Sequence, residues 1–223
     1  MFKTIMAALA AATLAVPSLA DPAVKGWKTH DSMGCMMLRE CTDEVVEITS
    51  VDDLDGYYPH SNFDPVRQET NGLITELRAM GVNVYLANEK YFPVGHAGVY
   101  DTVGNHFFLN DSYADDPYGM IRTLRHEAWH AAQDAMAGTI GNRHIAIIYP
   151  EESVPQEYVL ATDIAYAAQP NVIPWEREAK WAGGTPGMTL EVLEIINSTN
   201  NQPWRVIEPT PLTREWLENN GYL

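Results

Sequence analysis

The stretch His126-Glu127-Ala128-Trp129-His130 decides how the rest of this sequence is interpreted. On an α-helix, residues four apart share one face, with Cβ atoms about 5–6 Å apart, so His126 and His130 can reach one metal ion together. Glu127 lies about 100° further round the helix, where a carboxylate can act on a water at the metal without being a ligand. The stretch therefore predicts a helix that presents two imidazoles and one carboxylate to a common site.

The flanking residues predict a long helix with clear ends. Asp115-Asp116-Pro117 supplies a helix cap followed by proline at the first helical position, and Gly138 stands where a C-terminal glycine is expected. Apolar residues recur between them at helical spacing, which predicts one buried face. A helix with two structural histidines is the alternative, but that role gives the intervening glutamate no purpose. The apolar residues are Ile121, Leu124, Ala128, Ala131, Ala132, Ala135 and Met136.

The first twenty residues have the pattern of an export signal. Met1-Phe2-Lys3 is a short basic start, residues 5–16 are apolar and alanine-rich, and Ser18-Leu19-Ala20 offers small residues at a cleavage site. An uncleaved anchor is the alternative, but about twelve apolar residues are too few to span a bilayer. We therefore predict a signal peptide at 1–20, and a single domain at 21–223 located in the periplasm or outside the cell.

The protein is strongly acidic, with 14 lysines and arginines against 30 aspartates and glutamates and a formal net charge of −16. Such a surface repels phosphate groups, so neither nucleic acid nor an anionic membrane surface is expected as a partner. No segment after the signal peptide is long and apolar enough to predict a membrane span.

Two cysteines occur, Cys35 and Cys41. After export we expect them to form a disulfide, which in so short a loop would contribute about 2–3 kcal/mol and pin the N-terminal segment. Zinc binding by this pair is one alternative, although no further cysteine completes a thiolate site, and a pair of free thiols is the other.

The order of the expected elements predicts an α+β domain with a mainly helical C-terminal half. A helix capped by Asp64-Pro65 and closed by Gly81 precedes a strand, and two short strands then form a hairpin just before the histidine-bearing helix. The expected strands are 45–48, 82–87, 98–101 and 105–109, and the later helices are about 153–168, 174–182, 189–196 and 213–219.

HExxH on a helix is the signature of zinc hydrolases, and with the preceding helix and strands it resembles the N-terminal subdomain of zincins. The protein is similar to small gluzincin metallopeptidases, a resemblance that implies a zincin-like fold with a small mixed sheet packed on the HExxH helix. In that superfamily an edge strand just before this helix pairs with an extended substrate. The resemblance makes 105–109 the candidate for that strand, and an ordinary core strand is the alternative.

A catalytic zinc site uses three protein ligands and leaves a fourth position for water. No histidine follows His130 at the metzincin spacing, because His144 comes too late, so a carboxylate is favoured as the third ligand. The gluzincin family takes this ligand from a glutamate on a later helix, in an ExxA(D/N) pattern. The segment from Glu176 to Lys180 resembles that pattern, with Glu176 in the ligand position.

Lys180 departs from the family pattern, which often has Asp or Asn there to hydrogen-bond a zinc histidine. The departure keeps Glu178 as an alternative ligand, and Glu157 on the preceding helix is a third candidate. Residues 110–116 are acidic enough for Ca²⁺, but without the EF-hand glycine and terminal glutamate a turn with a helix cap is favoured. Gluzincins often place an oxyanion-stabilising residue after the active helix, where this protein has four candidates. They are His144, Tyr149, Tyr158 and Tyr166.

These features predict an exported zinc metallopeptidase that acts on peptides or proteins. Zn²⁺ held by His126, His130 and Glu176 would polarise the scissile carbonyl, and Glu127 would serve as the general base. A non-catalytic, zinc-stabilised secreted binding protein is the alternative, against which the presence of Glu127 argues. A secreted binding module without metal is a third hypothesis and requires the signature to be a coincidence.

Overall fold

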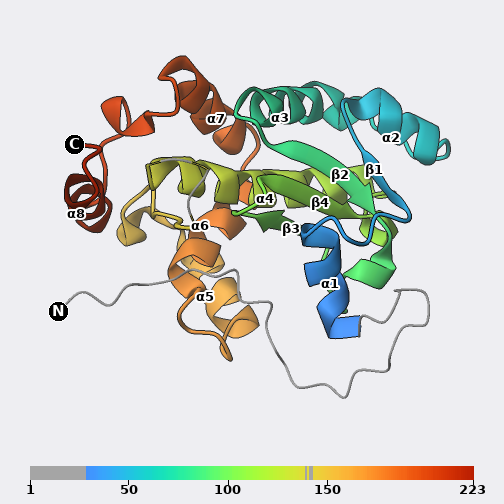
Figure 1. The fold of residues 1–223 in the computed structure, drawn as a ribbon, viewed down its shortest axis with the longest axis horizontal. Coiled ribbons are helices and arrows are strands. Elements are labelled where there is room, and N and C mark those ends of the chain that lie inside the picture. Colours follow the sequence, from blue (N-terminus) through green and yellow to red (C-terminus); the bar gives the residue numbers. More distant parts are fainter. Residues whose placement is uncertain (1–28, 139, 141–142) are drawn as a thin grey trace.

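The computed structural model describes residues 29–138, 140 and 143–223, so the predicted signal peptide at 1–20 lies outside the described residues. Within them, helices surround a small four-stranded sheet, and the part of the protein that follows the sheet is helical (Figure 1). This arrangement confirms the mixed α and β composition and the helical C-terminal half.

The sheet has the order β1-β2-β4-β3 and contains both kinds of strand pairing. Strand β1 is antiparallel to β2, β2 is parallel to β4, and β3 is antiparallel to β4, so the sheet is mixed, as predicted. The strands are β1 (Val45–Glu47), β2 (Asn83–Ala87), β3 (Gly98–Asp101) and β4 (His106–Asn110).

Strands β3 and β4 form the expected hairpin, and Asn105 in its turn has a left-handed φ of 54°. Because β4 also pairs with β2, it lies inside the sheet. The assignment of 105–109 as an edge strand for substrate is therefore wrong, and the edge strand of the hairpin is β3.

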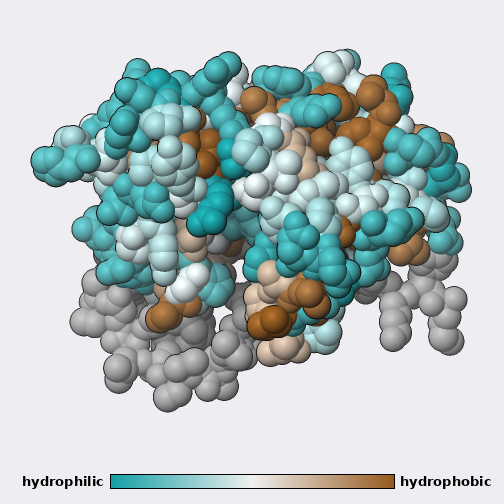
Figure 2. Space-filling model, turned by 180° about the vertical axis from the view of Figure 1, so that it is seen from behind, coloured by the Kyte–Doolittle hydropathy of each residue, from teal (hydrophilic) through white to brown (hydrophobic). Residues whose placement is uncertain are grey.

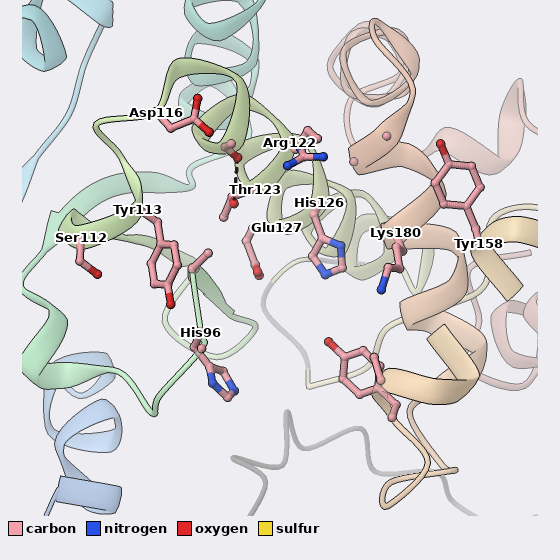
Figure 3. Close-up of a pocket in the computed structure, with 18 of the residues that line it drawn as sticks. His96, Ser112, Tyr113, Asp116, Arg122, Thr123, His126, Glu127, Tyr158 and Lys180 are labelled. Atoms are coloured by element: carbon pink, nitrogen blue, oxygen red, sulfur yellow. Dashed lines mark hydrogen bonds between the residues drawn. The ribbon is translucent and has the colours of Figure 1, made fainter. Parts of the chain in front are cut away.

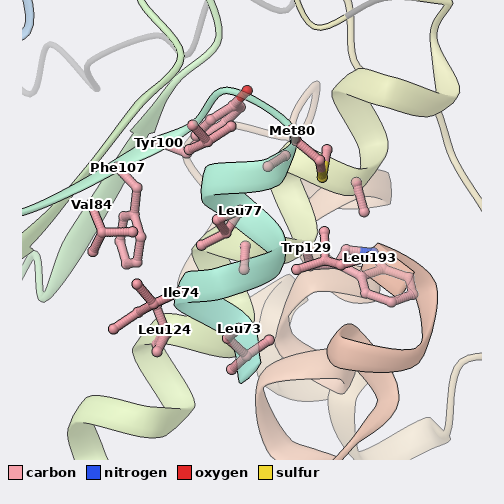
Figure 4. Packing of buried hydrophobic residues seen from close by; sticks show 14 of the residues in the cluster. Leu73, Ile74, Leu77, Met80, Val84, Tyr100, Phe107, Leu124, Trp129 and Leu193 are labelled. Carbon is pink, nitrogen blue, oxygen red and sulfur yellow. The ribbon is translucent and has the colours of Figure 1, made fainter. Parts of the chain in front are cut away.

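Two hydrophobic clusters cover opposite faces of the sheet because side chains alternate along each strand. Val84 of β2 and Phe107 of β4 belong to the larger cluster, with α3 (Arg67–Ala79) and α4 (Pro117–Met136), as Figure 4 shows. Their neighbours Tyr85 and Phe108 belong to the second cluster, with α1 (Thr29–Met37). The sheet thus lies between α1 and the α3–α4 layer.

The predicted disulfide is present between Cys35 of α1 and Cys41, with Cα atoms 5.3 Å apart. Cys35 is fully buried against the sheet, so the bond ties the turn after α1 to the second cluster. The sequence patterns did not predict α1 itself.

The structure corrects the start of one helix and adds another. Asp64 begins a 3₁₀ turn, Asp64–Val66, and its side chain accepts a hydrogen bond from Arg67 Nε at 3.1 Å, so α3 starts only at Arg67. Gly81 ends that region with φ 88°, as predicted. Helix α2 (Val51–Tyr57) was not predicted, although Ser50 and Asp53 form a capping box at its start.

The C-terminal half contains the four predicted helices with shifted ends. No helix of the described residues is long and apolar enough to cross a membrane. Seen from behind, the molecule has a largely hydrophilic surface with separate hydrophobic patches, as the acidic composition suggests (Figure 2). The helices are α5 (Gln156–Ala165), α6 (Ile173–Gly184), α7 (Met188–Ser198) and α8 (Pro211–Asn219).

Candidate metal centre

Helix α4 forms where the sequence predicts it and buries the expected stripe of apolar residues. The side chain of Asp116 accepts a hydrogen bond from the Tyr118 backbone at 3.1 Å, Pro117 occupies the first turn, and Gly138 follows the helix with φ 115°. Asn110 caps the preceding 3₁₀ turn in the same way. The turn-and-cap interpretation of 110–116 is therefore correct.

Helix α6 packs antiparallel against α4. Glu176, near the start of α6, lies opposite His126 and His130, whereas Gly183, near its end, lies against the backbone of Arg122 and the side chain of His126. A Cβ at Gly183 would be only 3.0 Å from the Arg122 carbonyl oxygen and 3.2 Å from His126 Cβ. Glycine therefore permits the close approach that brings Glu176 to the histidines.

The three predicted ligands meet at one point. Nε2 of His126 lies 3.3 Å from Oε2 of Glu176, Nε2 of His130 lies 3.6 Å from Oε1, and the three ligand atoms of the group lie within 4.8 Å of one another. Oε2 of Glu176 is buried and forms no hydrogen bond with the described residues. Two imidazole nitrogens facing a carboxylate with an unsatisfied oxygen fit a metal cation, so this group could hold a metal ion.

The charges in this group favour an ionised carboxylate. Burial raises the pKa of Glu176, but attraction to His130 and contacts with His126 and Tyr166 outweigh it and lower the pKa to about 2. Burial alone would lower the pKa of His126, whereas the close contact with Glu176 and its negative charge raise the pKa above its ordinary value. The glutamate is thus held as an anion beside the two rings.

A buried network behind the site orients His130. Nδ1 of His130 lies 2.8 Å from Oε1 of Gln133, whose Nε2 donates to Glu178 Oε2 at 2.8 Å and to the Trp175 carbonyl at 3.3 Å. Because the amide oxygen can only accept, Nδ1 donates to it, and Nε2 is directed at Glu176. Gln133 therefore supplies the hydrogen bond to a histidine that the gluzincin pattern assigns to an Asp or Asn at position 180, where this protein has a lysine.

Glu178 points away from the two histidines and lies outside the candidate metal-binding group. Its carboxylate is buried and accepts hydrogen bonds from Trp129 Nε1 at 3.1 Å, from Gln133, and from the backbone amides of Ile148 and Tyr149. Glu157 is exposed on α5 and lies outside the group. The sequence left three glutamates open, and the structure brings only Glu176 to the histidines.

Glu127 and His126 line a pocket of about 770 Å³ between α4, α6 and the segment before β3 (Figure 3). The side chain of Glu127 is almost fully buried, and burial raises its pKa. A Cβ at Gly98 would lie 2.8 Å from the Thr123 side chain and 3.0 Å from Glu127 Cγ, so glycine lets β3 lie directly beside Glu127.

Two of the four candidates for an oxyanion-stabilising residue line this pocket, namely Tyr158 and Tyr166. The other two lie elsewhere: Tyr149 packs against Trp129, and His144 packs against Trp216. Sequence reasoning missed the role of Gln133, for which the signal was its position three residues after His130, close to the same helix face.

Comparisons with protein-family models, with curated proteins and with solved structures find no match for this protein.

Proposed function

We propose that this protein is a zinc-dependent metallopeptidase with a zincin-like arrangement of its helices and sheet. One observation carries the proposal: His126, His130 and Glu176 converge from two antiparallel helices, and Glu127 lines the pocket that His126 also lines. A donor set of two imidazoles and one carboxylate suits zinc, and catalytic zinc sites often have this composition.

When bound, zinc would polarise the scissile carbonyl and increase the acidity of the attacking water. Glu127 takes the proton of that water and delivers it to the leaving amine. Burial raises the pKa of this carboxyl, which makes the carboxylate a stronger base for taking the proton from water. Tyr166 lines the pocket and contacts Glu176, so it is our candidate for stabilising the oxyanion.

An extended peptide would enter along β3. This strand has a neighbour, β4, on one side, and Gly98 at its start lines the pocket beside Glu127. A substrate strand added on the side of β3 that has no strand neighbour among the described residues would run past the catalytic carboxylate, with backbone hydrogen bonds providing affinity for many sequences. The disulfide and the basic, then apolar, first residues support export to the periplasm or outside the cell.

Metal analysis of the purified, exported protein together with a peptide-cleavage assay tests this function. We expect about one zinc per protein molecule, loss of cleavage with a chelator, and recovery when zinc is restored. Glu127→Gln should retain the metal and lose activity, because the base is removed and the ligands stay. Absence of bound metal, or a fully active Glu127→Gln protein, would contradict the proposal. Metal without any cleavage would favour a structural zinc site instead.

A further inference from the structure

Two cationic side chains, Arg122 and Lys180, each stand one helical turn from a candidate ligand on the same helix. Arg122 precedes His126 by four residues on α4, and Lys180 follows Glu176 by four residues on α6. Because the two helices are antiparallel, both steps lead toward the same end of the site. Arg122 and Lys180 both line the pocket that contains His126 and Glu127 (Figure 3).

These two cations differ from the other arginines of the same helices. Arg125 on α4 is bound through two nitrogens to Glu69, and Arg177 on α6 pairs with Asp163 and with Glu151. Within the described residues, by contrast, neither Arg122 nor Lys180 forms an ion pair with an acidic side chain.

The donors of Arg122 and Lys180 are available to a ligand. The hydrogen bond that Lys180 makes to described residues goes to the Ala161 carbonyl at 3.5 Å, and its ammonium group has three donors. Arg122 is exposed at the pocket wall, and its guanidinium can bind a carboxylate through two nitrogens.

The acidic surface around Arg122 and Lys180 makes this pair a local site of attraction for an anionic ligand. The protein has a net charge of −16, and Asp115 and Asp116, at the start of α4, also line the pocket. An anionic ligand is therefore repelled by most of the surface and attracted at the end of the pocket formed by Arg122 and Lys180.

We infer that Arg122 and Lys180 bind a carboxylate of the substrate about one helical turn from the reacting carbonyl. The inference rests on the proposed peptidase function and specifies its substrate class as peptides that carry a carboxylate close to the scissile bond. Two sources share this chemistry: the C-terminal carboxylate of a short peptide and the side chain of an acidic residue.

Binding to the Glu127→Gln protein loaded with zinc tests the inference without cleavage. The probes are dansyl-labelled Ala-Ala-Phe-Ala-Ala as free acid and as amide, and the amide with Glu or Gln as its last residue. We expect the acid forms to bind roughly tenfold more tightly than their neutral partners, with a preference that weakens in salt. Preference for the free acid identifies an exopeptidase-like terminus, and preference for Glu over Gln identifies an acidic side chain.

Two double variants test the two cations: Glu127→Gln combined with Arg122→Gln, and Glu127→Gln combined with Lys180→Met. In both, the preference for acid over neutral peptides should fall to near unity. The control is Glu127→Gln combined with Arg205→Gln, at an exposed arginine outside the pocket, which should retain the preference. Equal binding of acidic and neutral peptides by the Glu127→Gln protein, or no binding of any acid form, overturns the inference. Cleavage assays of Lys180→Met test whether Lys180 acts at the reacting carbonyl instead. An equal fall in kcat for acidic and neutral substrates would place Lys180 there and would also overturn the inference. Failure of the peptidase proposal itself would be recognised separately, because the wild-type protein would then bind no metal or cleave no peptide.

Discussion

Glu176 and Glu178 lie two residues apart on α6, and their surroundings are opposite. Glu178 faces the interior behind α4, where four donors from Trp129, Gln133, Ile148 and Tyr149 satisfy its carboxylate. Glu176 faces the two imidazole rings, where its Oε2 is buried without a hydrogen bond. A carboxylate whose partners all come from the protein holds the fold together, whereas one with an unsatisfied oxygen can bind a ligand.

Replacing Glu178 should give the largest effect on stability. Glu178→Ala removes the acceptor of two backbone amides and two side-chain donors that stay buried, which should lower the free energy of unfolding by roughly 3–5 kcal/mol. Urea unfolding of the metal-free protein measures the change, and Glu157→Ala, at an exposed glutamate, serves as the control, with an expected change within about 0.5 kcal/mol. Equal unfolding midpoints for wild type and Glu178→Ala would show that this network does not support the fold.

Replacing Glu176 should have its main effect on metal binding. Glu176→Gln keeps the side-chain volume but removes the anion, so metal affinity should fall about 100-fold or more. Competition with a chromogenic chelator measures the affinity. If Glu176→Gln bound zinc as tightly as wild type does, Glu176 would not be the third ligand of the candidate metal centre, and the contrast with Glu178 would fail.

The sequence predicted the histidine-bearing side of the candidate site, but it did not choose between Glu176 and Glu178. Helical spacing alone placed His126, Glu127 and His130 on one face, because that relation lies within a single element. The choice between Glu176 and Glu178 depends on the rotation of α6 against α4, which Gly183 permits and which no local pattern encodes. The assignment of 105–109 as an edge strand failed for the same reason, since the pairing of β4 with β2 joins two segments that have β3 between them in the sequence.

Gln133 connects the two glutamates and should show an intermediate effect. Gln133→Leu leaves His130 without a partner for Nδ1, so its ring can rotate and change tautomer, and metal affinity should fall about 10- to 100-fold. The same chelator competition measures this change, with Gln156→Leu, at an exposed position on α5, as the control. An unchanged affinity would mean that the packing around His130 alone fixes its ring.

Asp134, one turn after His130, is a third buried carboxyl, and only one of its oxygens is satisfied. Oδ2 accepts a hydrogen bond from the Tyr100 hydroxyl at 2.9 Å, whereas Oδ1 is buried with no hydrogen-bond partner among the described residues. Burial raises the pKa of Asp134 to about 8, although the Tyr100 hydrogen bond acts in the other direction. Asp134 is therefore protonated in the folded state at neutral pH and ionised in the unfolded state.

This difference in ionisation predicts a pH-dependent loss of stability. Between pH 4 and pH 8 the folded state holds a proton on Asp134 that the unfolded state has lost, so stability falls as pH rises, by at most about 1.4 kcal/mol per pH unit. Asp134→Asn does not titrate, so the free energy of unfolding of this variant, relative to wild type, should increase across that window and level off above it. Urea unfolding at a series of pH values measures this difference. A constant difference between the two proteins would show that Asp134 is ionised in the fold, and that a half-satisfied carboxylate can be buried here as an anion, as Glu176 is.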